Sequence, residues 1–171
     1  MKRPFKVALA SVLTLLAVGC AGYKLGPTGG SVAGSKSVRV NFFQNETEEP
    51  RLSTYVNNSL RKLIQQDGTY RLATRGEADI VVDGRIIGYG RSPLTYQPGD
   101  VITARDYRVS LTAHVTAIDS ITGKTVLDRE VQGRTTVRVG TDLTSADRQA
   151  APLLAEDLAR NTTALLVDGS W

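Results

Sequence analysis

The stretch from Tyr107 to Ala117 alternates strictly between apolar and polar side chains. A period of two places successive side chains on opposite faces of a β-strand. One face of this strand is therefore expected to be buried and the other to be wetter, as in an antiparallel sheet that is covered on one side. The apolar members of the alternation are Tyr107, Val109, Leu111, Ala113, Val115 and Ala117.

Three further segments are predicted to be strands. Ser37–Phe43 alternates in the same way, and Ala78–Gly90 is rich in β-branched residues, with Gly88–Gly90 marking a bend or bulge. The turn residues Asp119–Lys124 predict a hairpin that leads into a returning strand over Thr125–Val139, with Gly133 as a bulge.

The segment between the second and third predicted strands, Arg91–Asp100, is rich in turn residues and is predicted to be a connection. Its apolar residues Leu94 and Tyr96 have two readings. They either contact a partner or cover the end of the sheet.

Two helices are predicted from apolar residues that recur at helical spacing. The first spans about Leu52–Gln66 and is followed by Asp67-Gly68, a typical helix stop. The second follows Thr144 and Asp147, which match a capping box variant. Pro152 either kinks this helix or begins its main part.

The resulting order is strand, helix, three strands and helix. It predicts an α+β fold, a two-layer sandwich in which two helices pack on one face of a mixed four-stranded sheet. The first two strands are expected to be parallel because a helix connects them, and the last three to form an antiparallel meander.

The N-terminus has the layout of a secretory signal. The basic segment Met1–Lys6 precedes the apolar run Val7–Val18, which is too short to span a bilayer as a permanent helix. Cys20, the only cysteine, stands at the cleavage point, as in bacterial lipoprotein signals whose cysteine carries acyl chains such as palmitate. An ordinary cleaved signal or an uncleaved anchor is the alternative.

These features divide the chain into three parts. Residues 1–19 are predicted to be a lipoprotein signal peptide, 20–36 a lipidated N-terminus with a Gly/Ser-rich tether, and 37–171 a single domain. Ala21 and Gly22 follow the cysteine, with no Asp to retain the protein at the inner membrane. The expected location is the periplasmic side of the outer membrane, held by lipid.

The apparent basicity of the chain comes mostly from its signal. Three of the 21 basic residues, and none of the 17 acidic ones, lie in residues 1–19, so the mature chain carries a net charge of +1. No strongly basic stripe remains, and nucleic acid is therefore not expected as a partner.

The residues that catalysis would need are missing from the sequence. His114 is the only histidine, Cys20 is assigned to the lipid, and no nucleophile elbow is present. We expect no enzyme, no cofactor and no metal site. The scattered basic side chains are either solvated surface or converge on a phosphate-rich ligand, which the Arg fork suits.

Several short motifs, taken in order, resemble the LptE family of outer-membrane lipopolysaccharide-assembly lipoproteins. They cover nearly the whole mature chain, and their order together with the lipoprotein signal carries the resemblance. The motifs are Cys20–Leu25, Phe43–Thr47 with Pro50–Leu52, Arg91–Tyr96, Ala104–Val109 and Thr122–Lys124.

The resemblance implies a non-enzymatic partner of the β-barrel translocon LptD, placed inside the barrel as a plug, that helps lipopolysaccharide reach the outer leaflet. Lipopolysaccharide binding in the family is attributed to basic residues near the ends of the sheet. Tyr96–Gly99, at the tip of a hairpin here, contains no basic residue. The candidates are therefore residues flanking the tip and around the exit of the last strand: Arg91, Arg105, Arg138 and Arg148.

An alternative function is that of a lipoprotein regulator of a periplasmic enzyme such as a peptidoglycan synthase. Such regulators need a long tether to cross the periplasm, whereas the Gly/Ser-rich stretch here is short. A partner close to the outer membrane is therefore favoured.

Overall fold

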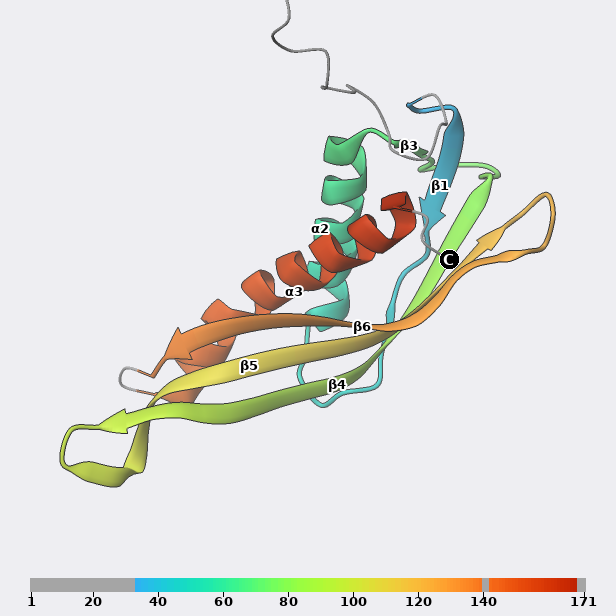
Figure 1. Cartoon of the computed structure of the whole chain (residues 1–171). Coiled ribbons are helices and arrows are strands. Elements are labelled where there is room, and N and C mark those ends of the chain that lie inside the picture. The colour runs from blue at the N-terminus through green and yellow to red at the C-terminus, as the bar shows by residue number, and fades with distance from the viewer. Residues whose placement is uncertain (1–32, 140–141, 169–171) are drawn as a thin grey trace, which may run out of the picture.

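The computed structural model describes residues 33–139 and 142–168, in which a mixed sheet packs against two helices (Figure 1). The strands are β1 (Lys36–Val40), β2 (Gln44–Asn45), β3 (Tyr70–Leu72), β4 (Ile80–Gln97), β5 (Asp100–Asp119) and β6 (Thr125–Arg138), and the helices are α2 (Leu52–Asp67) and α3 (Leu143–Asp168). None of the helices that the structure describes is long and apolar enough to cross a membrane.

The sheet has six strands, so the prediction of four was wrong in number. Its order is β3-β1-β4-β5-β6, with β2 pairing beside β4. The predicted directions are confirmed, because β1 and β4 are parallel and β4, β5 and β6 form an antiparallel meander. The short strands β2 and β3 were missed because two or three residues are too few to show a period.

The segment predicted as a turn-rich connection is mostly strand. β4 continues to Gln97, and Gly99 at φ 81° makes the turn into β5. The sequence shows no regular alternation of apolar and polar residues there because both faces of this end of β4 are exposed to solvent. Leu94 and Tyr96 are exposed rather than packed in the core.

Both helices differ slightly from expectation. α2 ends one residue later than predicted, and Gly68 at φ 75° closes it by donating its N–H to the Ile64 carbonyl. α3 is one continuous helix with Pro152 inside it. Its N-terminus is capped by Asp142, whose Oδ1 accepts from the Ser145 N–H at 2.6 Å, so the capping box at Thr144 was placed two residues too late.

The core lies between the helices and one face of the sheet. The apolar members of the β5 alternation from Val109 to Ala117 are fully buried, and Leu154 and Leu158 of α3 belong to the same cluster. Figure 1 shows α2 and α3 on the same side of the sheet. The prediction of one covered face is confirmed.

Two glycines allow close packing in this core. A Cβ on Gly133 would lie 2.4 Å from the Leu154 carbonyl oxygen, and one on Gly84 would lie 2.2 Å from the Phe43 ring. Gly133 pairs in register with Leu111, so its prediction as a bulge was wrong. It is required because α3 crosses β6 at that point. The predicted irregularity near Gly88 is confirmed by a register shift between Ile86 and Gly88.

Candidate functional site

The four candidate arginines do not form one cluster. Arg91 lies on β4 opposite Val109, on the sheet face that carries the helices. Arg138 ends β6 opposite Asp106, on the open face. Arg105 lies beside Asp106 on β5, and Arg148 is on the second turn of α3. Two aspartates lie among the four arginines, Asp147 on the helix-covered face of the sheet and Asp106 on the open face.

Asp147 joins the N-terminal part of α3 to β4. Its Oδ1 accepts a hydrogen bond from the Tyr89 hydroxyl at 2.9 Å, and its Oδ2 lies 2.8 Å from Nη1 of Arg91. Burial of Tyr89 and its hydrogen bond to this carboxylate raise the pKa of the phenol. Arg91 is therefore occupied in an ion pair that positions the helix, which the sequence pattern did not reveal.

A groove of about 760 Å³ opens beside Asp147, between the start of α3 and the start of α2. Arg148 of α3 and Arg51, just before α2, line it from opposite sides, together with the acidic Glu49. Arg51 precedes α2 at φ 67°, and no side chain caps that helix. The groove combines both signs of charge. The full lining is Glu49, Pro50, Arg51, Tyr55, Thr144, Asp147, Arg148 and Ala151.

Asp106 ties three strands together on the open face. The Thr95 hydroxyl donates to its Oδ2 at 2.5 Å, and Nε of Arg138 donates to its Oδ1 at 2.9 Å. The hydrogen bond from Thr95, followed by that from Arg138, lowers the pKa of Asp106 below its usual value. Arg138, like Arg91, is engaged by an acidic partner.

Arg105 and Arg148 differ from the other two. All four arginines are exposed, but within the described part of the chain neither Arg105 nor Arg148 has a carboxylate within 4 Å, whereas Arg91 and Arg138 each have one. They are the two candidates whose guanidinium groups a phosphate could approach without displacing an acid.

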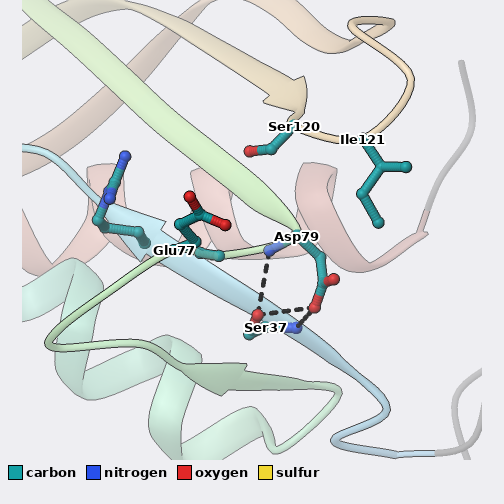
Figure 2. A pocket seen from close by; sticks show the side chains of 7 residues that line it. Ser37, Glu77, Asp79, Ser120 and Ile121 are labelled. Carbon is teal, nitrogen blue, oxygen red and sulfur yellow. Dashed lines mark hydrogen bonds between the residues drawn. The ribbon is translucent and has the colours of Figure 1, made fainter.

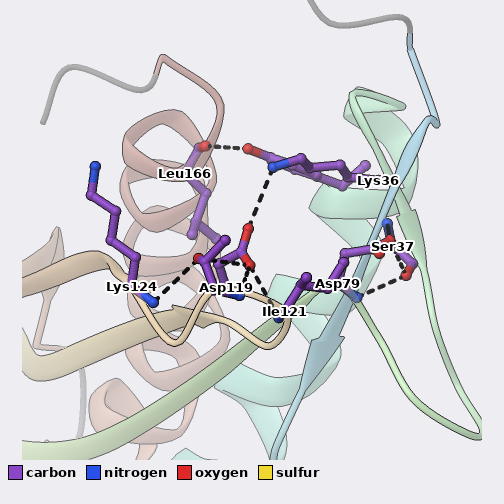
Figure 3. Close-up of polar contacts among 9 residues, drawn as sticks. Lys36, Ser37, Asp79, Asp119, Ile121, Lys124 and Leu166 are labelled. Carbon is purple, nitrogen blue, oxygen red and sulfur yellow. Dashed lines mark hydrogen bonds and ion pairs between the residues drawn. The ribbon is translucent and has the colours of Figure 1, made fainter.

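The opposite end of β5 carries a second polar network, which sequence reasoning missed. The Ser37 N–H and hydroxyl both donate to Asp79 Oδ2 at 2.7 Å, and these two bonds lower the pKa of Asp79. Lys36 lies 3.5 Å from Asp119 (Figure 3). Because Ser37 and Asp79 are 42 positions apart, no local pattern links them.

This network borders a shallow pocket of about 470 Å³ (Figure 2). Figure 2 shows Ser37 and Asp79 bonded to each other on one side of it, with Ser120 and Ile121 on the other. Its lining mixes carboxylates, hydroxyls and an arginine.

The remaining chemistry-bearing residues are paired or lie apart. Nε2 of His114 lies 2.9 Å from Asp128 across the open face. Within residues 33–139 and 142–168, no group of three or more His, Cys, Asp or Glu side chains is placed to hold a metal ion. Cys20 lies outside the described residues.

The chain matches the model of a known family. The model described as "LptE: Lipopolysaccharide-assembly" matches residues 35–166. Among curated proteins, none matches the chain.

Several solved structures are similar to the chain at low sequence identity. The hypothetical protein CT253 from Chlamydia trachomatis is 9% identical, with a TM-score of 0.56 over 77% of this chain and 97% of that one. The protein XCC0632 from Xanthomonas campestris is 12% identical, with a TM-score of 0.53 over 84% and 89%. The rare lipoprotein B from Shewanella oneidensis is 15% identical, with a TM-score of 0.45 over 75% and 90%. The first two comparisons establish similarity of fold alone.

Proposed function

The chain belongs to the LptE lipopolysaccharide-assembly family, and from this premise we propose that it is a non-enzymatic, lipid-anchored component of an outer-membrane complex, where it plugs an LptD-like β-barrel. The observation that carries the proposal is the family match, which spans residues 35–166 and so covers nearly the whole domain. A role in lipopolysaccharide assembly follows from membership. The anchor, the barrel and the ligand contacts are each proposed separately below.

The proposed anchor is Cys20, with residues 1–19 removed as a signal and residues 20–36 as the lipidated N-terminus and tether of the domain formed by 37–171. Mass spectrometry of the mature protein tests it. We expect an N-terminal cysteine that carries acyl chains, and an unprocessed, unmodified chain for Cys20→Ser. A mature N-terminus at any other residue contradicts the anchor.

The proposed partner is an LptD-like barrel. A sheet with one face covered by helices and a projecting β4–β5 ribbon supports this role, because it exposes a long polar strand face to a surrounding wall. Purification of the tagged lipoprotein from its native membranes in mild detergent should recover the barrel. Recovery of a periplasmic enzyme instead, such as a peptidoglycan synthase, would support the alternative function of an enzyme regulator.

The proposed lipopolysaccharide contacts are Arg91, Arg105, Arg138 and Arg148, with Arg105 and Arg148 contributing most. Because Arg91 and Arg138 are paired with acids, a phosphate must compete with Asp147 and Asp106 for them. Such half-exposed ion pairs are weak, so a phosphate can displace the carboxylate. The loss of the ion pair offsets part of the affinity that the new contact contributes.

Binding of purified lipopolysaccharide to single Arg→Gln variants tests this ranking. Each of Arg105→Gln and Arg148→Gln should weaken binding about tenfold, the value of one charge-assisted hydrogen bond, and should flatten its salt dependence. Arg91→Gln and Arg138→Gln should have smaller effects. Arg160→Gln, an exposed arginine elsewhere on α3, is the matched control. Unchanged binding in all four variants rejects the assignments.

A further inference from the structure

The β5–β6 turn lies at the end of the domain where the described chain begins. Asp119, at the end of β5, is 3.5 Å from Lys36, the first residue of β1. The Ser120 N–H donates to the Asp79 carbonyl at 2.8 Å. These contacts hold the turn beside the point from which the chain leads back toward Cys20 (Figure 3).

The turn is built to a fixed geometry. Asp119 Oδ1 accepts from the N–H groups of Ile121 at 3.1 Å and Thr122 at 2.9 Å, and also from the Thr122 hydroxyl. Gly123 at φ 69° completes the reversal into β6. The position of residue 121 is therefore set by the backbone rather than by packing of its side chain.

This turn presents apolar side chains to solvent. Ile121 is 81% exposed, and Ile118, at the end of β5, is 42% exposed. An isoleucine as exposed as this one, on a rigid turn, contributes little to the core. Removing such a side chain from water is worth on the order of a tenfold change in affinity.

The charges around Ile121 are balanced. Lys36 and Lys124 stand beside Asp119. Arg39, Glu77 and Asp79 line the same pocket as Ile121, so the described residues around the turn form no polybasic patch. This mixture fits the zwitterionic headgroup region of a phospholipid surface better than a strongly charged partner. Attraction to such a surface depends on the apolar side chain.

We propose that the β5–β6 turn is a membrane contact in which Ile121 inserts shallowly into the leaflet that holds the acyl chains of Cys20. The inference rests on the proposed anchor. The 13 residues from Cys20 to Ala33 span at most about 45 Å, so the turn stays close to the bilayer. Tethering at that range gives a high effective concentration, at which one inserted side chain suffices for frequent contact.

The experiment compares two exposed isoleucines at opposite ends of β5. Ile121→Cys and Ile102→Cys are each labelled with an environment-sensitive fluorophore, and Ile102 is the matched control because it is 87% exposed at the other end. The mature acylated proteins are reconstituted into phosphatidylcholine–phosphatidylethanolamine vesicles that contain headgroup-proximal nitroxide lipid. We expect quenching at position 121 to exceed quenching at position 102 at least threefold. High salt should reduce the quenching at position 121 only slightly. Equal quenching at the two positions overturns the proposal.

A second arm separates this inference from the proposed anchor. In it, Cys20 is replaced by a histidine tag that binds nickel-chelating lipid in the same vesicles, so attachment no longer depends on acylation. Preferential quenching at position 121 in this arm supports the contact even if the acylated form fails to attach. Its absence overturns the contact even if Cys20 is acylated.

A label-free measurement guards against effects of the fluorophore. Hydrogen exchange of the amides in residues 119–124 should slow when vesicles bind the nickel-anchored protein, and Ile121→Ser should abolish the slowing. Amides in residues 99–103 should not change. Slowing that persists in Ile121→Ser would contradict insertion of this side chain.

Discussion

Three aspartates hold distant parts of this domain to one another. Asp79 joins the start of β4 to Ser37 of β1, Asp106 joins Thr95 of β4 to Arg138 of β6, and Asp147 joins α3 to β4. For Asp79 and Asp106 the hydrogen bonds favour the ionised form and lower the pKa. Stability of the domain is therefore expected to depend on pH in the acidic range.

Asp79→Asn should lower the melting temperature at neutral pH. The folded-state pKa lies below the value of about 3.9 for an unfolded chain, so the stabilisation is present above that pH and is lost as pH falls through the folded pKa. Melting curves of both proteins from neutral to strongly acidic pH measure the difference.

The difference in melting temperature between the unmodified protein and Asp79→Asn should disappear in strong acid. Glu77→Gln, an exposed neighbour two positions away, controls for the general loss of a negative charge and should change little. A difference that stays constant down to strong acid contradicts the role of the ionised carboxylate.

Gly133→Ala should destabilise the domain by about 1–3 kcal/mol, the usual cost of overpacking. Its Cβ would meet the backbone of α3, 2.4 Å from the Leu154 oxygen and 2.6 Å from the Leu158 nitrogen. Urea denaturation measures the loss. Gly90→Ala is the control, because its Cβ would meet only the Ser110 hydroxyl, at 3.5 Å. Equal stabilities of the two variants would show that α3 can shift away.

At the scale of elements, β6 is the outermost strand of the sheet on one side. An open edge strand invites pairing with another chain. α3 blocks the middle of this edge, because Asp157 accepts from the Arg134 N–H at 2.9 Å and Asn161 donates to the Gln132 carbonyl at 2.7 Å. Gly133, between the two, is what lets the helix come close enough.

Removing these side chains should open the edge. In Asp157→Ala, exchange of the Arg134 amide should accelerate, and the free energy of unfolding should fall by about 1 kcal/mol, the net value of a typical hydrogen bond. The double variant with Asn161→Ala should also self-associate at lower concentration, which sedimentation measures.

The neighbouring Glu156 provides the control for this pair. Its exposed carboxylate pairs with Arg160 at 3.5 Å on the helix surface, so Glu156→Ala should change stability by less than about 0.5 kcal/mol. Unchanged exchange of Arg134 in Asp157→Ala would mean that the edge amide is protected by something else.

At the scale of the whole molecule, the β4–β5 ribbon continues past the end of β6 and beyond the core. Its tip exposes Leu94, Tyr96 and Ile102, between 38% and 87%. These residues contribute little to the domain itself. Under the proposed function they are available to the wall of a barrel.

Replacing Leu94, Tyr96 and Ile102 together by serine should therefore separate stability from association. We expect the free energy of unfolding to change by about 1 kcal/mol or less, whereas the buried control Leu111→Ala should cost about 2–5 kcal/mol. Recovery of the barrel in mild detergent should fall with the triple variant. Undiminished recovery would show that the tip does not carry the association.

The amino-acid sequence by itself determined much of the architecture. The alternation from Tyr107 to Ala117, the helical spacing after Leu52 and the glycine stop at Gly68 are local patterns, because each reflects one buried face or one turn. They were sufficient for the α+β class, the two helices and the directions of the long strands. The ordered motifs likewise indicated the family that the match over residues 35–166 shows.

Only the tertiary structure decided which charged residues remain available. Nothing in the sequence around Arg91 or Arg138 indicates that Asp147 and Asp106 engage them, since 56 and 32 positions separate the partners. The same holds for β3, which is three residues long and is defined by pairing with β1. Contacts between distant segments have no local period, so they emerge only when folding brings the segments together.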